Sequence, residues 1–547
     1  MSYLFLVHGS EVKSCDSLFT QYNNNEFPIQ LGSVNDSEPV SPRTIEGIAT
    51  GLIEMIRKVQ PMGPYRIAGW SFGGLVAYEI ATQLIGEDQE VVFIGLTDTL
   101  CRAALGDVQE HCAEESYGVT IVLTAMLPNI KGLNEEQGTT SKRPLRAGVI
   151  GDFVTFMDMD AVHLQPASPG AWLASRLSET QLRPETCRRA VTQYMPHYIP
   201  VAVHLFAGGN DHCLSPLASW RAVLPETQIR VIPTSAMYES VNISEVVSVD
   251  NRVLRESVRP ERANLPPLAE LTYRPLVPLH VGQHKSPTVF CVPGAGASVT
   301  NFVELLAYLP EAWTIYGLEP RGLDGTLVPH STAAASARFV LSKVYELRGD
   351  HPINLLGHSF GGWVAFEIAR QLLEAGHRIA SLLILDSEAP DDDEEVIKEC
   401  ERTDVAMNMI EALELLLKKP MGIHRPDMEL LSDSSQQALI HQNLVREGLL
   451  PMRSQPSVLH GPLRTLGMAL RSRYKPKGTY PGPASLILVD DPRLDKRANQ
   501  RKQDLLVEGW KKYVSSLTCF HIPGNHLTAL KAPHVRELAR ILAQSII

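Results

Sequence analysis

Two serines of this 547-residue chain lie in the pattern G-x-S-x-G, Ser71 in GWSFGG and Ser359 in GHSFGG. Where this pattern joins a strand to a helix, it forms a sharp turn that presents the serine hydroxyl outward. Glycines flank the serine because larger side chains would clash in so tight a turn. The N–H of the next residue points at the oxyanion that forms when the serine attacks a carbonyl. The pattern therefore predicts acyl transfer through an acyl-serine.

A serine hydroxyl is a weak nucleophile unless a neighbouring base takes its proton. Asp386 follows Ser359 by 27 residues, at the end of the apolar run LLIL, and His526 follows later in IPGNHLTAL. We predict that His526 is the base and that Asp386 orients its imidazole and stabilises the imidazolium. The expected oxyanion donors are the backbone N–H groups of Phe360 and of Ala295, in PGAGA. Two acids and two histidines remain alternatives: Asp490, Asp491, His521 and His534.

The sequence around the two serines repeats over whole domains. YRIAGWSFGGLVAYEIATQL matches INLLGHSFGGWVAFEIARQL, and Asp98 follows Ser71 at the spacing that separates Asp386 from Ser359. FLVHGSEV near the start of the chain likewise matches FCVPGAGA. These matches predict two complete copies of one domain, separated by a linker rich in proline and charge.

In each copy, strands that are apolar throughout alternate with amphipathic helices, a pattern typical of a parallel sheet covered on both faces. The chain order Ser, Asp, His is that of the α/β-hydrolase fold. We predict an α/β protein of two tandem α/β-hydrolase domains, each a mostly parallel sheet flanked by helices with a helical lid insertion. The expected boundaries are a domain at 1–250 with its lid at 99–200, a linker at 251–285, and a domain at 286–547 with its lid at 387–480. No strand is obvious in either lid, and the linker is expected to end in an edge strand at LVPLHV, which the first copy lacks.

The first copy has lost its expected base. Trp220 and Trp510 align without a gap, and sixteen residues further on the second copy has His526 where the first has Ala236. Both segments share the dipeptide IP on the way. Losing the histidine of a serine triad costs about 10⁶-fold in kcat, so we predict that the first copy is weak or inactive.

The degenerate first site would keep Ser71 and Asp98. His212 is an alternative base, because it lies in a loop where many α/β hydrolases keep their acid, here Asp211. The first copy reads VHGSEV where the second reads VPGAGA, so its oxyanion loop near Ser10 carries a bulkier, charged neighbour, Glu11, a further sign of decay.

The composition excludes some functions and partners. With a net charge of −11, the chain has no excess of Lys and Arg for neutralising nucleic-acid phosphates. The eight cysteines form no C-x-x-C pair and have no histidines at zinc spacing, so no metal is expected. We find neither a signal peptide nor a run of about 18 apolar residues, and so expect a cytoplasmic protein without a membrane span.

Both copies resemble the thioesterase domains that end nonribosomal peptide synthetases, related to those of polyketide and fatty-acid synthases. The matching motifs are GPYRIAGWSFGG, INLLGHSFGGWVAFEIARQL and GNHLTAL. FCVPGAGASVTNF with YGLEPRGLDG resembles the second unit of synthetases that finish with two thioesterases in tandem. The resemblance implies a partner, an acyl or peptidyl carrier protein whose phosphopantetheine arm delivers a thioester to Ser359. Release would give an acid, a macrolactone or a macrolactam. No cofactor or metal is implied, because a thioester carbonyl is already activated.

Three other functions remain open from the sequence. The same chemistry would suit an editing thioesterase that clears misloaded carrier proteins. A non-catalytic scaffold that binds carrier proteins, and a lipase or carboxylesterase, are the other two.

Overall fold

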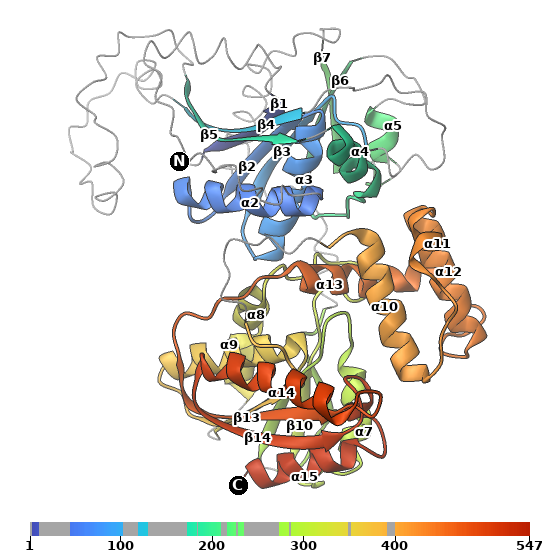
Figure 1. The fold of residues 1–547 in the computed structure, drawn as a ribbon. Helices are drawn as coiled ribbons and strands as arrows, with labels where there is room; N and C mark the ends of the chain where they lie inside the picture. Colours follow the sequence, from blue (N-terminus) through green and yellow to red (C-terminus); the bar gives the residue numbers. More distant parts are fainter. Residues whose placement is uncertain are drawn as a thin grey trace, which may run out of the picture.

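A computed structural model describes the chain at residues 3–9, 44–101, 119–128, 172–182, 184–208, 216–221, 223–225, 228–234, 273–283, 286–347, 352–390 and 400–546. For 119–128 and 172–182 only the backbone is described. The described strands form two seven-stranded sheets that share no strand (Figure 1). We call residues 1–250 the first half and residues 273–547 the second half.

The first half contains one sheet and four described helices. Its elements are β1 (Leu4–Gly9), α2 (Ile45–Val59), β2 (Tyr65–Trp70), α3 (Phe72–Gly86), β3 (Val91–Thr97), β4 (Val119–Pro128), β5 (Trp172–Leu182), α4 (Pro184–Gln193), β6 (Val203–Gly208), α5 (Pro216–Arg221) and β7 (Ile229–Thr234).

The second sheet and its helices begin with an edge strand at the end of the predicted linker. The elements are β8 (Leu276–His280), β9 (Thr288–Val292), η6 (Val299–Phe302), α7 (Val303–Leu306), β10 (Thr314–Leu318), α8 (Ala333–Leu347), β11 (Ile353–His358), α9 (Phe360–Glu374), β12 (Ile379–Leu385), α10 (Arg402–Leu417), α11 (Arg425–Glu429), α12 (Asp433–Arg446), η7 (Pro456–Leu459), α13 (His460–Arg471), β13 (Tyr480–Asp490), α14 (Lys496–Lys511), β14 (Val514–Pro523), η8 (Thr528–Leu530) and α15 (Val535–Ser545).

Each of the two sheets contains a core of five parallel strands. The first has the order β5-β4-β1-β2-β3-β6-β7, and the second, read in the same direction, β8-β10-β9-β11-β12-β13-β14. Strands β1, β2, β3, β6 and β7 pair in parallel, as do their counterparts β9, β11, β12, β13 and β14. The serine motifs follow β2 and β11, in the middle of each sheet.

The sheets differ on the other side of that core. Next to β9 lies the parallel strand β10, followed by the antiparallel edge strand β8, which confirms the edge strand predicted at LVPLHV. Next to β1 lie two antiparallel strands, β4 and β5. Both belong to the stretch 99–200, so the prediction of a lid without strands was wrong there. The run VTIVLTAMLP is rich in β-branched and apolar residues, which favour a strand, and it finds a partner in β1.

In its described part, the predicted lid of the second half consists of helices joined by loops, up to the start of β13 at Tyr480. Helices α10, α11, α12 and α13 fall between β12 and β13 and form their own apolar cluster around Ile410, Met428 and Ile440. In Figure 1, α13 lies between the two sheets.

The sheet of the second half is buried on both faces, because side chains alternate along each strand. In β9, Phe290 and Val292 join a cluster with residues of α8, α9 and α14. Val289 and Cys291 join a second cluster with residues of α7 and α15. Helix α9 ends at Glu374, and Gly376 follows with φ +82°, the left-handed conformation in which glycine commonly ends a helix.

The loop at residues 320–331 of the second half packs against the end of α3 in the first half. Val328 is buried within the apolar core of the first half. Ser331 donates from its N–H to the Gly86 carbonyl (3.0 Å) and from its hydroxyl to the Gln83 carbonyl (2.8 Å). Arg321 forms an ion pair with Asp88. The two halves therefore share buried contacts in addition to the chain that links them.

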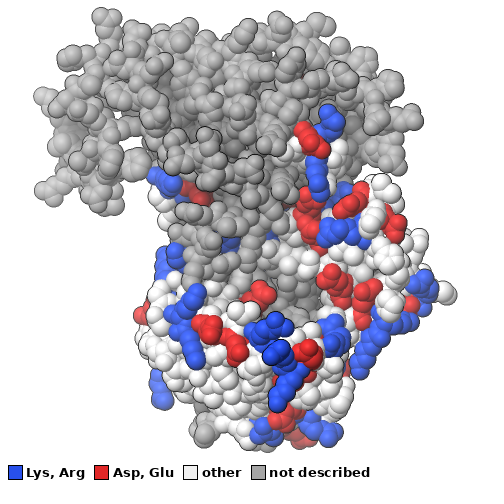
Figure 2. All heavy atoms as spheres, viewed as in Figure 1, with Lys and Arg blue, Asp and Glu red and all other residues white. Residues whose placement is uncertain are grey.

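Charges of both signs are mixed on one face of the described part of the molecule. On the face seen in Figure 2, Lys and Arg alternate with Asp and Glu, without a continuous patch of either sign. In the described part of the chain, no helix is long and apolar enough to cross a membrane.

Candidate active site

Ser359 occupies a strained turn between β11 and α9. Its backbone has φ 55° and ψ −129°, a conformation that L-residues rarely adopt. The turn is fixed by hydrogen bonds from the Ser359 N–H to the Leu385 carbonyl (3.0 Å) and from the Gly362 N–H to the Ser359 carbonyl (2.8 Å). A Cβ on Gly357 would lie 2.3 Å from the Gly361 carbonyl oxygen. The flanking glycines are therefore a steric requirement, as the sequence predicted.

Asp386 and His526 meet at the same edge of the sheet. Asp386 directly follows β12, the strand beside β11, and its N–H is held by the Ile487 carbonyl at 2.9 Å. His526 lies in the loop after β14 and donates from Nδ1 to Asp386 Oδ2 at 2.8 Å. Because the carboxylate can only accept, Nδ1 carries a proton and Nε2 of the neutral ring is left as the basic nitrogen. Burial alone would raise the pKa of Asp386, but the hydrogen bond from His526 and the charge of Lys502 outweigh it and lower that pKa.

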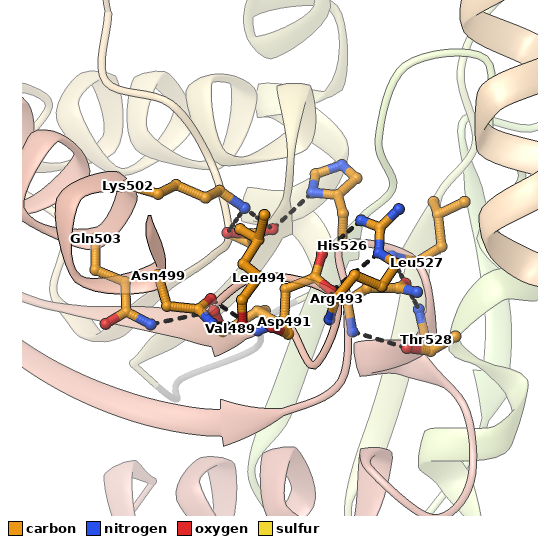
Figure 3. Close-up of polar contacts among 12 residues, drawn as sticks. Val489, Asp491, Arg493, Leu494, Asn499, Lys502, Gln503, His526, Leu527 and Thr528 are labelled. Carbon is orange, nitrogen blue, oxygen red and sulfur yellow. Dashed lines mark hydrogen bonds and ion pairs between the residues drawn. The ribbon is translucent and has the colours of Figure 1, made fainter. Parts of the chain in front are cut away.

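The Asp386 carboxylate has a second side-chain partner, Lys502, which the sequence did not predict. It reaches from α14 to within 3.2 Å of both oxygens of Asp386. Figure 3 shows Lys502 and His526 pointing toward the same carboxylate from opposite sides. Lys502 therefore helps to keep that carboxylate charged.

Three of the four alternative residues, Asp490, Asp491 and His521, have other partners. Asp490 accepts from Gln503 (2.8 Å) and lies 3.5 Å from His521. Asp491 is held by Arg493, through both its N–H and its guanidinium. Among the candidates, the structure therefore brings together Asp386 and His526.

His358, the residue before Ser359, ties the loop of His526 to the serine turn. Its Nε2 lies 2.8 Å from the His526 carbonyl oxygen, and the two rings are 4.7 Å apart. A carbonyl only accepts, so Nε2 must carry the proton. Burial and the neighbouring His526 lower the pKa of His358 to about 3, which keeps its ring neutral. The sequence motif marks this position only as variable, so pattern reasoning could not have found the contact.

The loop carrying Ala295 passes directly over Ser359. A Cβ added to Gly294 would lie 3.1 Å from Cβ of Ser359. Glu319 holds the end of this loop by accepting from the Val299 N–H at 2.9 Å. A cavity of about 50 Å³ opens here, and its walls come from this loop, the start of α9, the loop at 320–331 and α13: Val292, Gly294, Ala295, Phe360, Val364, Arg321, His330, Thr465 and Ala469 are among them.

The chain matches a known protein family in both halves. The family model for the thioesterase domain matches it at residues 25–147 and again at 287–546. The chain belongs to the thioesterase family. This membership gives an α/β-hydrolase-type fold with parallel sheets and helices, and it assigns the chain to the thioesterase class of hydrolases.

Similar proteins include large synthetases. "Inactive atromentin synthetase invA3" of Paxillus involutus is 24% identical over 513 residues, which are 91% of this chain and 49% of that protein. "N-(5-amino-5-carboxypentanoyl)-L-cysteinyl-D-valine synthase" of Penicillium rubens is 42% identical over 57 residues, 10% of this chain and 2% of that protein. The chain thus spans about half the length, or much less, of these relatives. Among solved structures, the Vlm2 thioesterase domain is 24% identical, with 49% of this chain and 96% of that one covered and a TM-score of 0.36.

The first thioesterase match contains the same serine turn. Ser71 has φ 50° and ψ −121°, and its N–H donates to the Thr97 carbonyl at 2.9 Å. A Cβ on Gly69 would lie 2.3 Å from the Gly73 carbonyl oxygen, the distance found for the equivalent pair around Ser359. The backbone of the thioesterase elbow is therefore intact in both halves.

The two tryptophans that align the halves occupy equivalent places. Trp220 is fully buried and donates from Nε1 to the Thr99 carbonyl at 2.9 Å, one residue after Asp98. Trp510 is fully buried and donates to the Ser387 carbonyl at 2.8 Å, one residue after Asp386. These bonds support the sequence alignment that places Ala236 opposite His526.

The carboxyl of the first half lacks the partners of its counterpart. Among the described residues, no hydrogen bond or ion pair reaches the Asp98 side chain, and partial burial raises its pKa. Four other positions of the first site lie outside the described residues: Ala236, His212, Asp211 and Glu11. The loss of the base at Ala236 therefore remains a prediction from sequence.

Proposed function

We propose that the second half is a serine thioesterase that releases an acyl or peptidyl chain from the phosphopantetheine arm of a carrier protein. The observation that carries the proposal is the hydrogen bond from His526 to Asp386, placed beside a strained serine turn by the contact of His358. In this family the substrate bond is a thioester, and the residues around Ser359 can cleave it without another reagent.

The first step would form an ester on Ser359. His526 Nε2 takes the hydroxyl proton as Oγ attacks the thioester carbonyl, and Asp386 stabilises the imidazolium that results. The carbonyl oxygen becomes an oxyanion facing the N–H groups of Phe360 and Ala295. Phe360 is the first residue of α9, so its N–H has no partner within the helix. When the carbon–sulfur bond breaks, the imidazolium gives its proton to the leaving thiolate.

The second step would free the chain and restore the enzyme. His526 takes a proton from water, or from a hydroxyl or amine of the chain itself, which attacks the ester carbonyl. The proton returns to Ser359 Oγ as the ester breaks. Water yields an acid, and an internal nucleophile yields a macrolactone or a macrolactam.

The first half would not turn over at a comparable rate. Ser71 has the elbow, but Asp98 has no imidazole partner among the described residues. Its contacts with the loop at 320–331, which also lines the cavity beside Ser359, suit a supporting role instead.

The test is release from a carrier protein loaded with an acyl-pantetheine chain, followed by mass spectrometry. Ser359→Ala should abolish release, and Ser71→Ala should leave it near the wild-type rate. The product mass separates hydrolysis from cyclisation, which differ by one water. Loss of release in Ser71→Ala with retention in Ser359→Ala would overturn the assignment.

A further inference from the structure

A second cavity, of about 60 Å³, lies between the two halves. The first half contributes Glu46 of α2 and residues 193–197, and the second half contributes α10, α12 and α13. Helix α13 separates this cavity from the one beside Ser359, because Thr465 and Ala469 line the latter. We call it the inter-half cavity.

The lining of the inter-half cavity has an excess of basic side chains. Three arginines, two histidines and two acids take part: Arg402, Arg464, Arg471, His197, His460, Glu46 and Asp433. Burial lowers the pKa values of both histidines, so they add no charge at neutral pH. One positive charge is therefore uncompensated within this lining.

The two acids offset part of the positive charge of the arginines but accept no hydrogen bond from them. Arg402 Nε lies 3.7 Å from Asp433, and Arg471 Nη1 lies 3.7 Å from Glu46, distances too long for hydrogen bonds. Arg402 Nε is buried and has no hydrogen-bond partner in the described part of the chain.

Arg464 is the most strongly buried of the three arginines. It is only 5% exposed, and within the described residues its Nη1 has no hydrogen-bond partner. Its Nη2 donates to the Tyr198 carbonyl of the first half at 3.3 Å. A charged donor that is buried without an acceptor is strongly unfavourable, and a bound water or ion would supply the missing acceptor.

We propose that the inter-half cavity binds one small tetrahedral oxyanion of the phosphate type, held by Arg464 and Arg402. A water-sized group needs about 10–15 Å³ on this measure, so the volume suits the four oxygens of a phosphate. The free donors come from two separate helices, α13 and α10, which suits an anion whose oxygens point in several directions. Guanidinium groups are the usual protein partners of phosphate. The bound anion would join the lid helices to the first half through Arg464.

The experiment is titration of the full chain with inorganic phosphate, followed by calorimetry at constant ionic strength set with sodium chloride. Saturable binding is expected, with a matching rise in the unfolding temperature. Losing a charged donor pair should weaken binding about tenfold or more in Arg464→Met and in Arg402→Gln. Arg453→Gln, an exposed arginine of the same insertion outside the cavity, is the matched control and should bind as wild type.

Two cavity variants are used in case one of them fails to fold. Arg402 is less buried than Arg464, so its substitution should disturb folding less. A parallel titration with 4′-phosphopantetheine distinguishes a free phosphate from the phosphate of a carrier arm, and tighter binding of either identifies the source. Absence of saturable binding, or equal binding by wild type and both cavity variants, would overturn the proposal. The readout does not depend on acyl release, so it stands apart from the proposed function.

Discussion

Ser71 and Ser359 stand on the same backbone turn, but their surroundings differ. Both have φ near 50°, both donate to the neighbouring strand, and both precede a helix that starts with FGG. Next to Ser359, however, a histidine is paired with a carboxylate, whereas the carboxyl near Ser71 has no such partner among the described residues. The comparison shows that the strained turn follows from the packing of glycines between strand and helix. The proton acceptor comes from a distant loop and can be lost separately.

The variant with the largest expected effect removes this difference between the two halves. His526→Ala gives the second half the residue that the alignment gives the first half at Ala236. We expect kcat for acyl release to fall about 10⁶-fold, because Ser359 would lose its base. Single-turnover release from a loaded carrier protein measures this. A fall of less than about tenfold would show that another group serves as the base.

A second variant tests the carboxylate. Asp386→Asn keeps the shape but not the charge that orients and stabilises the imidazole, so kcat should fall about 10⁴-fold. Asp98→Asn is the matched control and should leave release unchanged. If both variants lost activity equally, the two halves would not be as different as we infer.

Substituting the residue before each serine should have a smaller effect on kcat. The second half has His358 and the first has Trp70 at this position. His358→Phe keeps a ring but removes the N–H that holds the His526 carbonyl, and misplacement of the base should lower kcat about 10- to 100-fold. KM should change little, because the histidine ring is buried behind the turn. His358→Gln, which restores a donor, should recover part of the rate, and Trp70→Phe should have no effect.

Much of this site could be predicted from the sequence, because the serine turn has a local signature and its glycines are required by close contacts. Asp386 and His526 followed from chain order once the alternation of strands and helices was recognised. Lys502 and His358 were not predicted, since their contacts depend on how α14 and the last loop pack. Strand β4 was missed because an apolar run does not by itself distinguish strand from helix. Strand β5, WLASRLSETQL, is too polar to stand out as a strand, and it is defined by its antiparallel pairing with β4.

The smallest expected effect is on stability, and it comes from substituting one buried glutamate in each half. Glu79 and Glu367 are equivalent buried acids on α3 and α9, and each accepts from a tyrosine hydroxyl, at 3.1 and 2.6 Å. Arg370 binds Glu367 through two nitrogens and keeps its pKa low in spite of burial. In the first half this position is Thr82, and burial together with Glu46 raises the pKa of Glu79 to about 7.

The contributions of Glu79 and Glu367 to stability change with pH in opposite directions. Because folded Glu79 holds its proton to a higher pH than the unfolded chain, its contribution to stability falls as pH rises from about 4.5 to 7. Glu79→Gln should therefore stabilise the protein by about 2 kcal/mol at pH 8 and by little at pH 4.5. Glu367→Gln should destabilise it at pH 8 by a similar amount, because Arg370 loses its buried partner. Unfolding temperatures measured across this pH range check both, and equal responses would contradict the assignment.

The most direct test of the central claim is labelling with a fluorophosphonate, which reacts rapidly with a serine that has been activated by a base. The full chain, His526→Ala and Ser71→Ala would be treated in parallel, and the labelled peptides mapped by mass spectrometry. We predict label on Ser359 in the wild type and in Ser71→Ala, its loss in His526→Ala, and little label on Ser71. Label on Ser71 at a rate comparable to that of Ser359, or none on Ser359, would contradict the account.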